Sequence, residues 1–577
     1  MNVQDKIKKQ ILHNMGVTQE EFDAWGHTVY GMDQSIKNKF EEIVKSADKI
    51  RLHGDYDVDG ITATYIMRKT LMEISGKSVY EHLPARFTEG FGLKPFEIDN
   101  LYTEDKAMLD AGKNVLIVTV DNGIASYDAI EKAKSYGYTV IVTDHHELGN
   151  NKLPNADLCI DPMVEGYNPF DSKYYCGAGV AYKIAEEFIK DKTAIYDLKV
   201  FAALATICDV MILKEDNHTM VRDVLHELRE GNVPLPLKLL GIAKDFNFNY
   251  ISEKDFGFTF GPMFNASSRL YDKGATEVFD FLLSPTQEKA TEIVAINEER
   301  KAIVKEEVPV ILEDMKNDTD IFTSHISVNT DGSKSIAFAV NPNIFKPVIS
   351  YGKNLHEGII GIIAGQVTEN YDLPSIILTE DPEHLGNLKG SARSIEGFHI
   401  YDFLSEIDKQ HPDIFVGFGG HAGAAGLSIH ADKLQELKDA VNEKTYERPT
   451  KSVKPDPISI KADQIPLVYE TEQNYIPFGN GNPDIDISCY VHLFYDKARW
   501  VGAEKKTLVM SKSKYKIMGF GIRDNIPDTQ KLTVTGPLEL SVFNNRADIM
   551  LNVKSVCEYE KVQKKESEVD NEIDYSE

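Results

Sequence analysis

Short apolar runs in the first part of this 577-residue chain end repeatedly in loops that carry acidic residues or histidines. Three runs, at 49–52, 115–120 and 138–143, are typical of buried strands, and the loops that follow them are 53–60, 121–123 and 144–147. In an open parallel sheet, ligands and catalytic groups gather at the carboxyl ends of the strands, so these loops should converge on one crevice. Carboxylates crowded so closely would repel one another without a cation, and the pattern therefore predicts a metal site.

The first loop also begins like the loop of a calcium-binding EF-hand, because Asp55, Asp57, Asp59 and Gly60 have the DxDxDG spacing. An EF-hand needs a glutamate at the twelfth position of the loop and a helix before it. Here Ile66 stands at the twelfth position, and a strand is expected before the loop. We therefore reject a calcium site.

A centre that holds two metal ions fits these loops better, with a further acidic stretch at 208–210. Its expected ligands mix imidazole and carboxylate groups and are His53, Asp57, Asp59, Asp121, His145 and Asp209. That mixture favours manganese, with iron or magnesium as alternatives. Two ions about 3.5–4 Å apart can clamp a phosphoryl group for in-line attack. The site predicts hydrolysis of a phosphate ester or anhydride.

Composition limits the class of protein. The net charge of -28, from 63 basic and 91 acidic side chains, argues against a general nucleic-acid coat but leaves room for a local basic groove. There is no apolar run of about 18 residues, and the first residues lack the apolar core of a signal peptide, so we expect no membrane association. Five dispersed cysteines without CxxC spacing favour the reducing cytoplasm.

The length requires several domains. We expect a helical N-terminal extension (1–47), an α/β domain with a parallel sheet (48–225), a helical connector (226–330), a second α/β domain (331–446), a small β-barrel (458–560) and a disordered acidic tail (561–577). Within the connector, Gln287 to Met315 is typical of one long charged helix that links the two α/β domains. A simple solvated surface helix is the alternative.

Four motifs together resemble the DHH phosphoesterase superfamily: HGDYDVDG (53–60), VTVDNG (118–123), VTDHHE (142–147) and ICDV (207–210). Further stretches are similar to the RecJ family of single-strand-specific 5′→3′ DNA exonucleases: CGAGVA (176–181), GPMFNASSR (261–269), LHEGIIG (355–361), KGSARSIEGFH (389–399), FGGHAGAAG (418–426) and PFGNGNP (477–483). A lone DHH tripeptide would carry little weight, but this many stretches in one order carry much more.

The resemblance implies manganese-dependent hydrolysis of single-stranded DNA from its 5′ end, releasing 5′ mononucleotides in DNA recombination and repair. It implies that the six residues named above are the metal ligands. Asp121 ends the strand next to the first loop, and we expect it to bridge the two ions. His146 resembles the residue that touches the scissile phosphate, and Asp144 is expected to orient its neighbours. Asp55 is left open between a ligand and a residue that shapes the loop.

The second α/β domain resembles the DHH-associated domain, which faces the first domain and holds the substrate. Ser391 and Arg393 resemble a clamp for the 5′-phosphate, with Arg86 as a helper from the first domain. Arginine suits this role because its planar guanidinium matches phosphate oxygens. Arg269 is expected to grip the strand backbone, and His421 lies in a glycine-rich loop that would approach the nucleotide closely.

The C-terminal barrel resembles an OB-fold, which binds single strands by stacking and through a basic groove. Candidate contacts there are Trp500, Lys505, Lys506, Lys512, Lys514 and Lys516, although a solvated hairpin face is the alternative for the lysines. The expected partners are single-stranded DNA with a 5′ end and a single-strand-binding protein or helicase. We expect a monomer.

Two positions depart from the family pattern. Met263 and Gln366 stand where arginines are usual, and Met263 with Phe264 is open to a role as an apolar wedge against bases. Two other functions compete with the exonuclease: a phosphodiesterase acting on short RNA or cyclic dinucleotides, and a catalytically inactive scaffold. The first generally lacks the barrel, and the second would have lost metal ligands, whereas the metal motifs here are intact.

Overall fold

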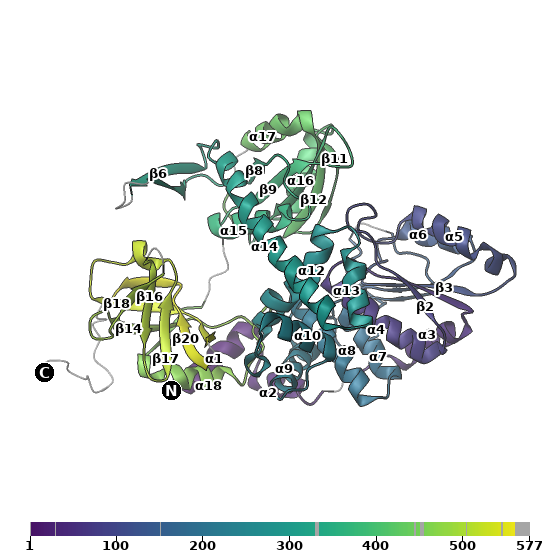
Figure 1. The fold of residues 1–577 in the computed structure, drawn as a ribbon, viewed down its shortest axis with the longest axis horizontal. Helices are drawn as coiled ribbons and strands as arrows, with labels where there is room; N and C mark the ends of the chain where they lie inside the picture. The colour runs from purple at the N-terminus through teal and green to yellow at the C-terminus, as the bar shows by residue number, and fades with distance from the viewer. Residues whose placement is uncertain are drawn as a thin grey trace.

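The computed structural model describes residues 2–28, 30–149, 152–328, 334–443, 446–450, 455–502, 505–543 and 546–559. The acidic tail expected at 561–577 lies outside these residues. Figure 1 shows the first α/β domain at the right, the second above it, and a strand-rich domain at the left. Among the described residues, no helix combines the length and hydropathy that crossing a bilayer requires.

The first domain contains a sheet of five parallel strands in the order β2-β1-β3-β4-β5, so the predicted parallel sheet is confirmed. The strands are β1 (Lys49–His53), β2 (Val79–His82), β3 (Val115–Val120), β4 (Thr139–Thr143) and β5 (Leu158–Ile160). All six residues of β3 are buried, as expected for a strand with helices on both faces. Strands β1, β3 and β4 end where the acidic loops begin.

Helices cover both faces of this sheet. One face packs against α3 (Gln34–Ser46), α4 (Val58–Ser75), α7 (Gly177–Phe188) and α8 (Lys192–Cys208), and the other against α5 (Pro95–Asp110) and α6 (Tyr127–Ser135). The side chains of β3 alternate between these faces, since Leu116 and Val118 join the first core while Val115 and Ile117 join the second. The loops at the strand ends therefore lie on one edge of a rigid layer.

The segment 226–330 is mostly helical. It begins within α9 (Glu215–Arg229) and continues through α10 (Leu235–Lys244), η1 (Phe248–Tyr250), α11 (Glu253–Asp255), the π-helix η2 (Phe256–Phe260), α12 (Gly261–Leu270) and α13 (Gly274–Leu283). Most of its buried side chains up to Ile293 pack in the core of the first domain, while Ala266 and Leu270 pack with residues of the second. The connector expected here thus shares a core with the parallel sheet over most of this range.

The long helix α14 spans Gln287–Met315, the range predicted from the sequence. Its first part packs against α10 and α12, and its end packs against β8 (Val348–Tyr351) and α15 (Ile360–Tyr371) of the second domain. The prediction of a helix linking two α/β domains is therefore confirmed.

The second α/β domain has the strand order β11-β12-β10-β9-β8, in which only β8 and β9 are parallel. Its other elements are β9 (Ser375–Glu380), β10 (Asn387–Arg393), α16 (Ile400–Gln410), β11 (Phe415–Gly420), β12 (Ala424–His430), η3 (Ala431–Lys433) and α17 (Leu434–Asn442). A hairpin of β6 (Phe322–Val328) and β7 (Lys334–Val340) projects from the body of the domain (Figure 1).

The C-terminal domain consists of two sheets, ordered β13-β14-β18-β21 and β15-β16-β17-β20-β19, that enclose a common core. This arrangement agrees with the expected OB-fold-like barrel. Its elements are β13 (Ile458–Ile460), η4 (Ala462–Gln464), α18 (Ile465–Glu472), β14 (Ile487–His492), β15 (Arg499–Val501), β16 (Thr507–Ser511), β17 (Tyr515–Gly519), η5 (Ile522–Asn525), β18 (Lys531–Gly536), β19 (Leu538–Phe543), β20 (Arg546–Asn552) and β21 (Ser555–Glu558).

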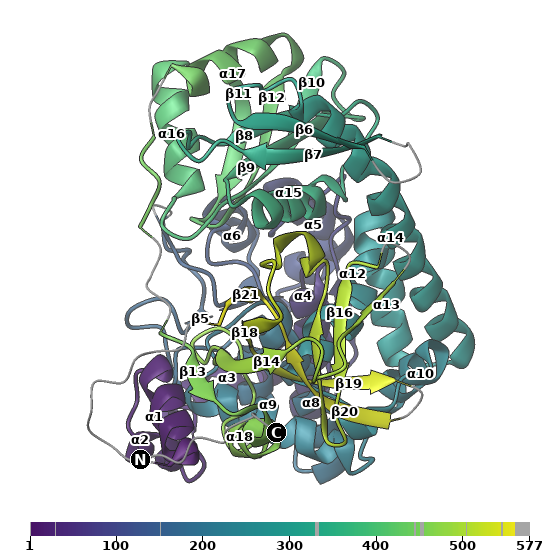
Figure 2. The ribbon, with the colours of Figure 1, turned by 90° about the vertical axis from the view of Figure 1, so that its left-hand side faces the viewer.

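The N-terminal helices do not form a separate extension. Helix α1 (Val3–Met15) lies beside β13 and α18 of the barrel (Figure 2), and α2 (Gln19–Trp25) follows it. Ile7, Ile11 and Trp25 are buried in the core of the C-terminal domain. The next helix, α3, instead packs on the first α/β domain. The start of the chain therefore bridges two domains that lie far apart in the sequence.

Candidate metal centre and substrate site

Two carboxylates of the first acidic loop are held by helix N-termini. Asp57 caps α4, and its Oδ1 accepts hydrogen bonds from the N–H groups of Asp59 and Gly60 at 3.0 and 3.1 Å. The carboxylate of Asp59 accepts hydrogen bonds from the first residues of α7, Gly177 and Ala178, at 2.7 Å each. Peptide dipoles at a helix N-terminus favour negative charge, so both side chains have fixed positions.

Asp121, the residue after β3, has a left-handed backbone with φ +61°. Such a conformation is unfavourable for a residue with a side chain and is found preferentially at functional sites. The side chain lies over the start of α7, where a Cβ added to Gly177 would lie 2.4 Å from Asp121 Oδ1. Glycine at 177 is therefore what allows this carboxylate to reach the site.

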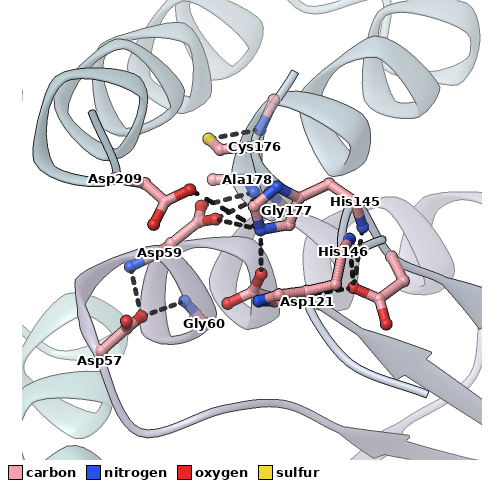
Figure 3. A network of polar contacts seen from close by, with 12 residues as sticks. Asp57, Asp59, Gly60, Asp121, His145, His146, Cys176, Gly177, Ala178 and Asp209 are labelled. Atoms are coloured by element: carbon pink, nitrogen blue, oxygen red, sulfur yellow. Dashed lines mark hydrogen bonds and ion pairs between the residues drawn. The ribbon is translucent and has the colours of Figure 1, made fainter. Parts of the chain in front are cut away.

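His145 points its Nε2 into a group of three carboxylates (Figure 3). The distances are 3.1 Å to Asp121 Oδ1, 3.6 Å to Asp59 Oδ2 and 3.7 Å to Asp209 Oδ2. Burial, together with the charge of the neighbouring His146, lowers the pKa of His145 to about 4. The ring is therefore neutral at physiological pH, as a metal-ligating imidazole must be.

The surrounding carboxylates carry more negative charge than the protein groups around them neutralise. Burial and the charges of Asp59 and Asp57 raise the pKa of Asp121 well above its usual value and that of Asp209 to about 8. Burial and Asp57 also raise the pKa of Asp55. Oδ1 of Asp55 is buried and has no hydrogen-bond partner among the described residues. Crowded, desolvated carboxylates beside a neutral imidazole fit a divalent cation.

Among the described residues, four groups of side chains each bring their ligand atoms within 4.8 Å of one another. Two of them make up the candidate centre and share no residue: Asp59 with His145 and Asp209, and Asp55 with Asp57 and Asp121. A further group joins Asp121 to His145 and His146. Because Asp121 also lies beside His145, it stands between the two sets, in the bridging position expected from the sequence. Asp55, which the sequence left open, belongs to the second set. The DxDxDG spacing, in which Asp55 is the first aspartate, is the sequence pattern from which this position could have been predicted.

The structure does not bring His53 into either set. Parallel pairing of β1 with β2 places His53 opposite His82, and Glu97 of α5 lies between the rings. Glu97 Oε1 is 3.0 Å from His53 Nε2 and 3.4 Å from His82 Nε2. The sequence analysis expected His53 to be a ligand of this centre. In the structure, the register of β1 against β2 directs its ring to a separate group with His82 and Glu97.

Asp144 orients its neighbours. Its Oδ1 accepts a hydrogen bond from the backbone N–H of His145 at 2.7 Å and pairs with Nδ1 of His146 at 2.8 Å, while Oδ2 accepts one from Ile124 at 2.9 Å. Burial alone would lower the pKa of His146, but the charge and hydrogen bond of Asp144 outweigh it and raise that pKa to about 9. His146 is therefore a cation at the edge of the carboxylate group.

The expected phosphate clamp forms a cluster of arginines. In the described residues, Arg86, Arg269 and Arg393 form no ion pair, whereas four other arginines do. The Arg86 guanidinium lies 4.7 Å over the ring of Tyr56, and Nη1 of Arg393 donates to Ser391 Oγ at 3.1 Å. Burial, with the charges of Arg86 and Arg393, lowers the pKa of Arg269 to about 9. Three clustered like charges fit an anion placed among them.

The two α/β domains meet beside this cluster. A Cβ on Gly358 would lie 1.9 Å from the carbonyl oxygen of Arg269, so glycine is required for the close contact between the LHEGIIG stretch (355–361) and α12. His421 of the second domain lies with its ring 6.4 Å from that of His146, at an interplanar angle of 18°. Predicted substrate-binding residues from both domains thus lie next to the predicted metal centre.

Met263 and Phe264 are fully buried in the core of the first domain. They cannot act as a wedge between bases, and that alternative is wrong. At position 263, where the family usually has an arginine, this chain has a methionine whose side chain lies in the protein interior.

Several barrel residues that were predicted to contact DNA already have partners within the protein. Arg523 lies 5.2 Å from the ring of Trp500, Lys512 pairs with Asp496 at 2.8 Å, and Lys516 pairs with Asp548 at 2.5 Å. Sequence reasoning missed the exposed aromatic residues after β14, Phe494 and Tyr495, which are 75% and 68% exposed. A signal existed in the aromatic and basic residues at 490–500.

Comparison with known proteins agrees with this arrangement. Residues 49–208 match the DHH family, N-terminal domain, and residues 344–447 match the DHHA1 domain. The single-stranded-DNA-specific exonuclease RecJ of Haemophilus influenzae is 31% identical over 431 residues, which span 72% of this chain and 69% of the relative. RecJ of Bacillus subtilis is 29% identical over 544 residues, 91% of this chain and 63% of the relative.

A solved structure of RecJ from Thermus thermophilus in complex with Mn²⁺ has the same fold, with a TM-score of 0.71. The match covers 96% of this chain and 78% of that chain at 21% sequence identity. The two α/β domains and the strand-rich domain therefore follow a known architecture.

Proposed function

The chain belongs to the RecJ family of single-stranded-DNA-specific exonucleases, and we propose that it removes 5′ mononucleotides from the 5′ end of single-stranded DNA. The observation that carries the proposal is the placement of an uncompensated arginine cluster beside a group of buried carboxylates at the domain junction. A phosphodiester chain supplies the negative charge that the arginine cluster lacks. Its cleavage needs the cations that the buried carboxylates would hold.

The centre would bind two divalent ions, with Mn²⁺ as the main candidate and Mg²⁺ as the alternative. Asp59, His145 and Asp209 would hold one ion, Asp55 and Asp57 the other, and Asp121 would contact both. When bound, such ions activate water and neutralise charge that develops on the phosphoryl oxygens. The raised pKa values of Asp121 and Asp209 support this proposal, because a cation removes the cause of the shift.

His146 would donate a hydrogen bond to a non-bridging oxygen of the scissile phosphate. Asp144 engages Nδ1, so Nε2 keeps its proton and is available to the substrate. A fixed donor aimed at an oxygen that gains charge lowers the barrier more than a mobile one.

Ser391 and the arginine cluster would bind the terminal 5′-phosphate. Arginine side chains without carboxylate partners are ready to pair with phosphate oxygens. A terminal phosphate carries more charge than an internal phosphodiester, so a site built from Arg86, Arg269 and Arg393 would select the strand end. Binding at a fixed distance from the metal ions would release one nucleotide per cleavage.

The barrel would hold the strand that remains. Phe494 and Tyr495 are exposed beside Lys497 and Arg499, which form no ion pair in the part of the chain that the structure describes. Aromatic faces stack on unpaired bases, and cations contact the backbone, which favours single strands over duplex. We place this activity in recombination and repair in the cytoplasm, carried out by a monomer with a single-strand-binding protein or helicase as partner.

The test is product analysis on a 3′-labelled single-stranded DNA with a 5′-phosphate, in the presence of Mn²⁺. Progressive shortening that requires Asp121, shown by its loss in Asp121→Ala, and that spares duplex DNA is the expected result. Cleavage of a dinucleotide or cyclic dinucleotide without shortening of the long strand would instead support the phosphodiesterase. Inertness on every substrate would support the scaffold.

A further inference from the structure

The glycine-rich stretch PFGNGNP at 477–483 lies outside the predicted chemistry, yet it contacts the backbone beside Asp209. The side-chain amide of Asn480 donates a hydrogen bond from Nδ2 to the carbonyl oxygen of Val210 at 2.8 Å. The carbonyl oxygen of Asn480 accepts one from the N–H of Leu213, also at 2.8 Å. This pair of bonds joins the C-terminal domain to the segment that follows α8.

Asp209 depends on its backbone for position more than the other residues of its set. Among the described residues, no N–H group donates a hydrogen bond to its carboxylate, whereas Asp59 accepts two. Its side chain is 33% exposed, against 2% for Asp59 and 8% for His145. The direction of the Asp209 side chain is therefore set by the turn in which α8 ends.

That turn has an unfavourable conformation. Val210 has φ +54°, a left-handed backbone that a β-branched residue rarely adopts and that glycine usually supplies at the end of a helix. The N–H of Met211 bonds to the carbonyl oxygen of Thr206 at 3.0 Å, which closes the helix end. The Val210 side chain is 65% exposed, so its own packing does not hold the turn. The hydrogen bond from Asn480 is the contact that fixes its carbonyl.

The donor loop is itself rigid. Asn482 is fully buried, and its Nδ2 donates to the carbonyl oxygens of Tyr475 at 2.9 Å and Pro477 at 2.6 Å. The glycines on either side of Asn480 allow the loop to lie directly against Ile212 and Leu213. A Cβ on Gly479 would lie 2.9 Å from the side chain of Leu213, and a Cβ on Gly481 would lie 2.9 Å from that of Ile212.

We infer that Asn480 is a positioning residue, which holds Val210 in its left-handed conformation and thereby keeps Asp209 directed at His145 and the metal ion that this set would bind. The inference rests on the proposed metal centre. It gives the PFGNGNP loop a role at the active site, and it makes the affinity of the centre for metal depend on the C-terminal domain.

The test measures Mn²⁺ binding to the metal-free full chain, by the electron paramagnetic resonance signal of free Mn²⁺. Asn480→Ala should weaken binding at the affected site about 10-fold, the scale seen when a residue that orients a metal ligand is lost. Asn474→Ala removes an amide that, among the described residues, bonds only to its own helix end, and it should leave binding unchanged. Thermal unfolding of each variant checks that it is folded.

A second pair of variants separates positioning from general stability. Glycine adopts the left-handed conformation without support, so Val210→Gly removes the need for the contact from Asn480. In that background the Asn480→Ala change should alter Mn²⁺ affinity less than about 2-fold, which is within the agreement expected of independent sites. The rate of the Asn480→Ala variant should also return to the wild-type value at high Mn²⁺ concentration.

Several results would overturn the inference. Equal Mn²⁺ affinity of Asn480→Ala and the wild type is one, and an equal loss in Asn474→Ala is another. A loss in the Val210→Gly background as large as in the wild type would show that Asn480 does not act through Val210. If the wild type itself bound no Mn²⁺, the proposed centre would fall, and the inference with it.

Discussion

The ring of His421, in the second α/β domain, lies 6.4 Å from the ring of His146 in the first, with the two planes 18° apart. His146 is fixed by Asp144, while His421 is exposed on the loop after β11. The two side chains therefore face the same space from opposite domains. A substrate phosphate at the centre would lie within reach of both, so catalysis would require the domains to keep this relationship.

Loss of the His421 ring should impair catalysis without affecting metal binding. His421→Ala should lower kcat/KM on single-stranded DNA about 10-fold or more, because a donor to the phosphate is lost, while Mn²⁺ binding stays unchanged. Steady-state kinetics and a metal titration measure the two quantities. His430→Ala is the matched control, since His430 lies on the next strand and contacts Asn387 instead. An unchanged kcat/KM in His421→Ala would contradict the assignment.

The arginine cluster should determine the preference for a 5′-phosphate. Arg393→Ala should lower kcat/KM on a 5′-phosphorylated strand about 10- to 100-fold, and on a 5′-hydroxyl strand far less, because only the first substrate uses the charge-assisted contact. Arg393→Lys should restore part of the effect, since a lysine keeps the charge but not the bidentate geometry. Equal losses on both substrates would place Arg393 on the strand backbone instead.

The metal-free protein should lose stability as pH rises. Asp209 has a folded pKa of about 8, above its value in the unfolded chain, so the folded state binds more protons between those values. The protonated Asp209 carboxyl therefore stabilises the folded state at low pH, and this stabilisation is lost as the pH rises through about 8. Thermal unfolding across pH 5 to 9 measures this trend, with Asp209→Asn as the variant in which it should weaken.

Added metal should reverse that loss. At a Mn²⁺ concentration 100 times its dissociation constant, binding stabilises the folded state by about 2.7 kcal/mol. The rise in Tm should be larger at pH 8 than at pH 6, because carboxylates must be deprotonated to bind the ion. A rise that is independent of pH would indicate that the ion binds elsewhere.

Gly177 should tolerate no side chain. In Gly177→Ala, the new Cβ would meet Asp121 Oδ1 at 2.4 Å and displace the carboxylate that stands between the two sets. We expect at least about a 10-fold loss of Mn²⁺ affinity together with loss of nuclease activity. Gly365→Ala is the control, because nothing lies within 4 Å of its Cβ position in α15. Equal metal binding in both variants would show that the site can adjust.

Much of the fold follows from local sequence. The apolar runs before His53, Asp121 and Asp144 lie in the observed strands β1, β3 and β4, and the range Gln287–Met315 is the observed helix. Both succeed because periodicity and length are local properties. The gathering of Asp59, Asp121 and His145 also follows, since the ends of parallel strands share one edge of the sheet. Asp209 stands at the end of helix α8, so the order of the strands does not by itself place it there.

Other features depend on contacts between distant segments, which no local pattern records. Whether His53 or Asp55 faces the metal centre depends on the pairing of His53 with His82 across β1 and β2. The packing of Ile7 and Ile11 against the C-terminal core is of the same kind. The sequence marked the PFGNGNP stretch as specific, but only the structure brings Asn480 to Val210.

The central claim is that the arginine cluster holds the 5′ end while the metal centre cleaves the adjoining bond. The most direct measurement follows a 5′-³²P label on single-stranded DNA in the first turnover with Mn²⁺. If the 5′ end is held in this way, all of the released label should be mononucleotide at every time point, including the earliest. Label that remains on progressively shorter strands, or appears in longer fragments, would show cleavage from the 3′ end or within the strand, and would contradict it.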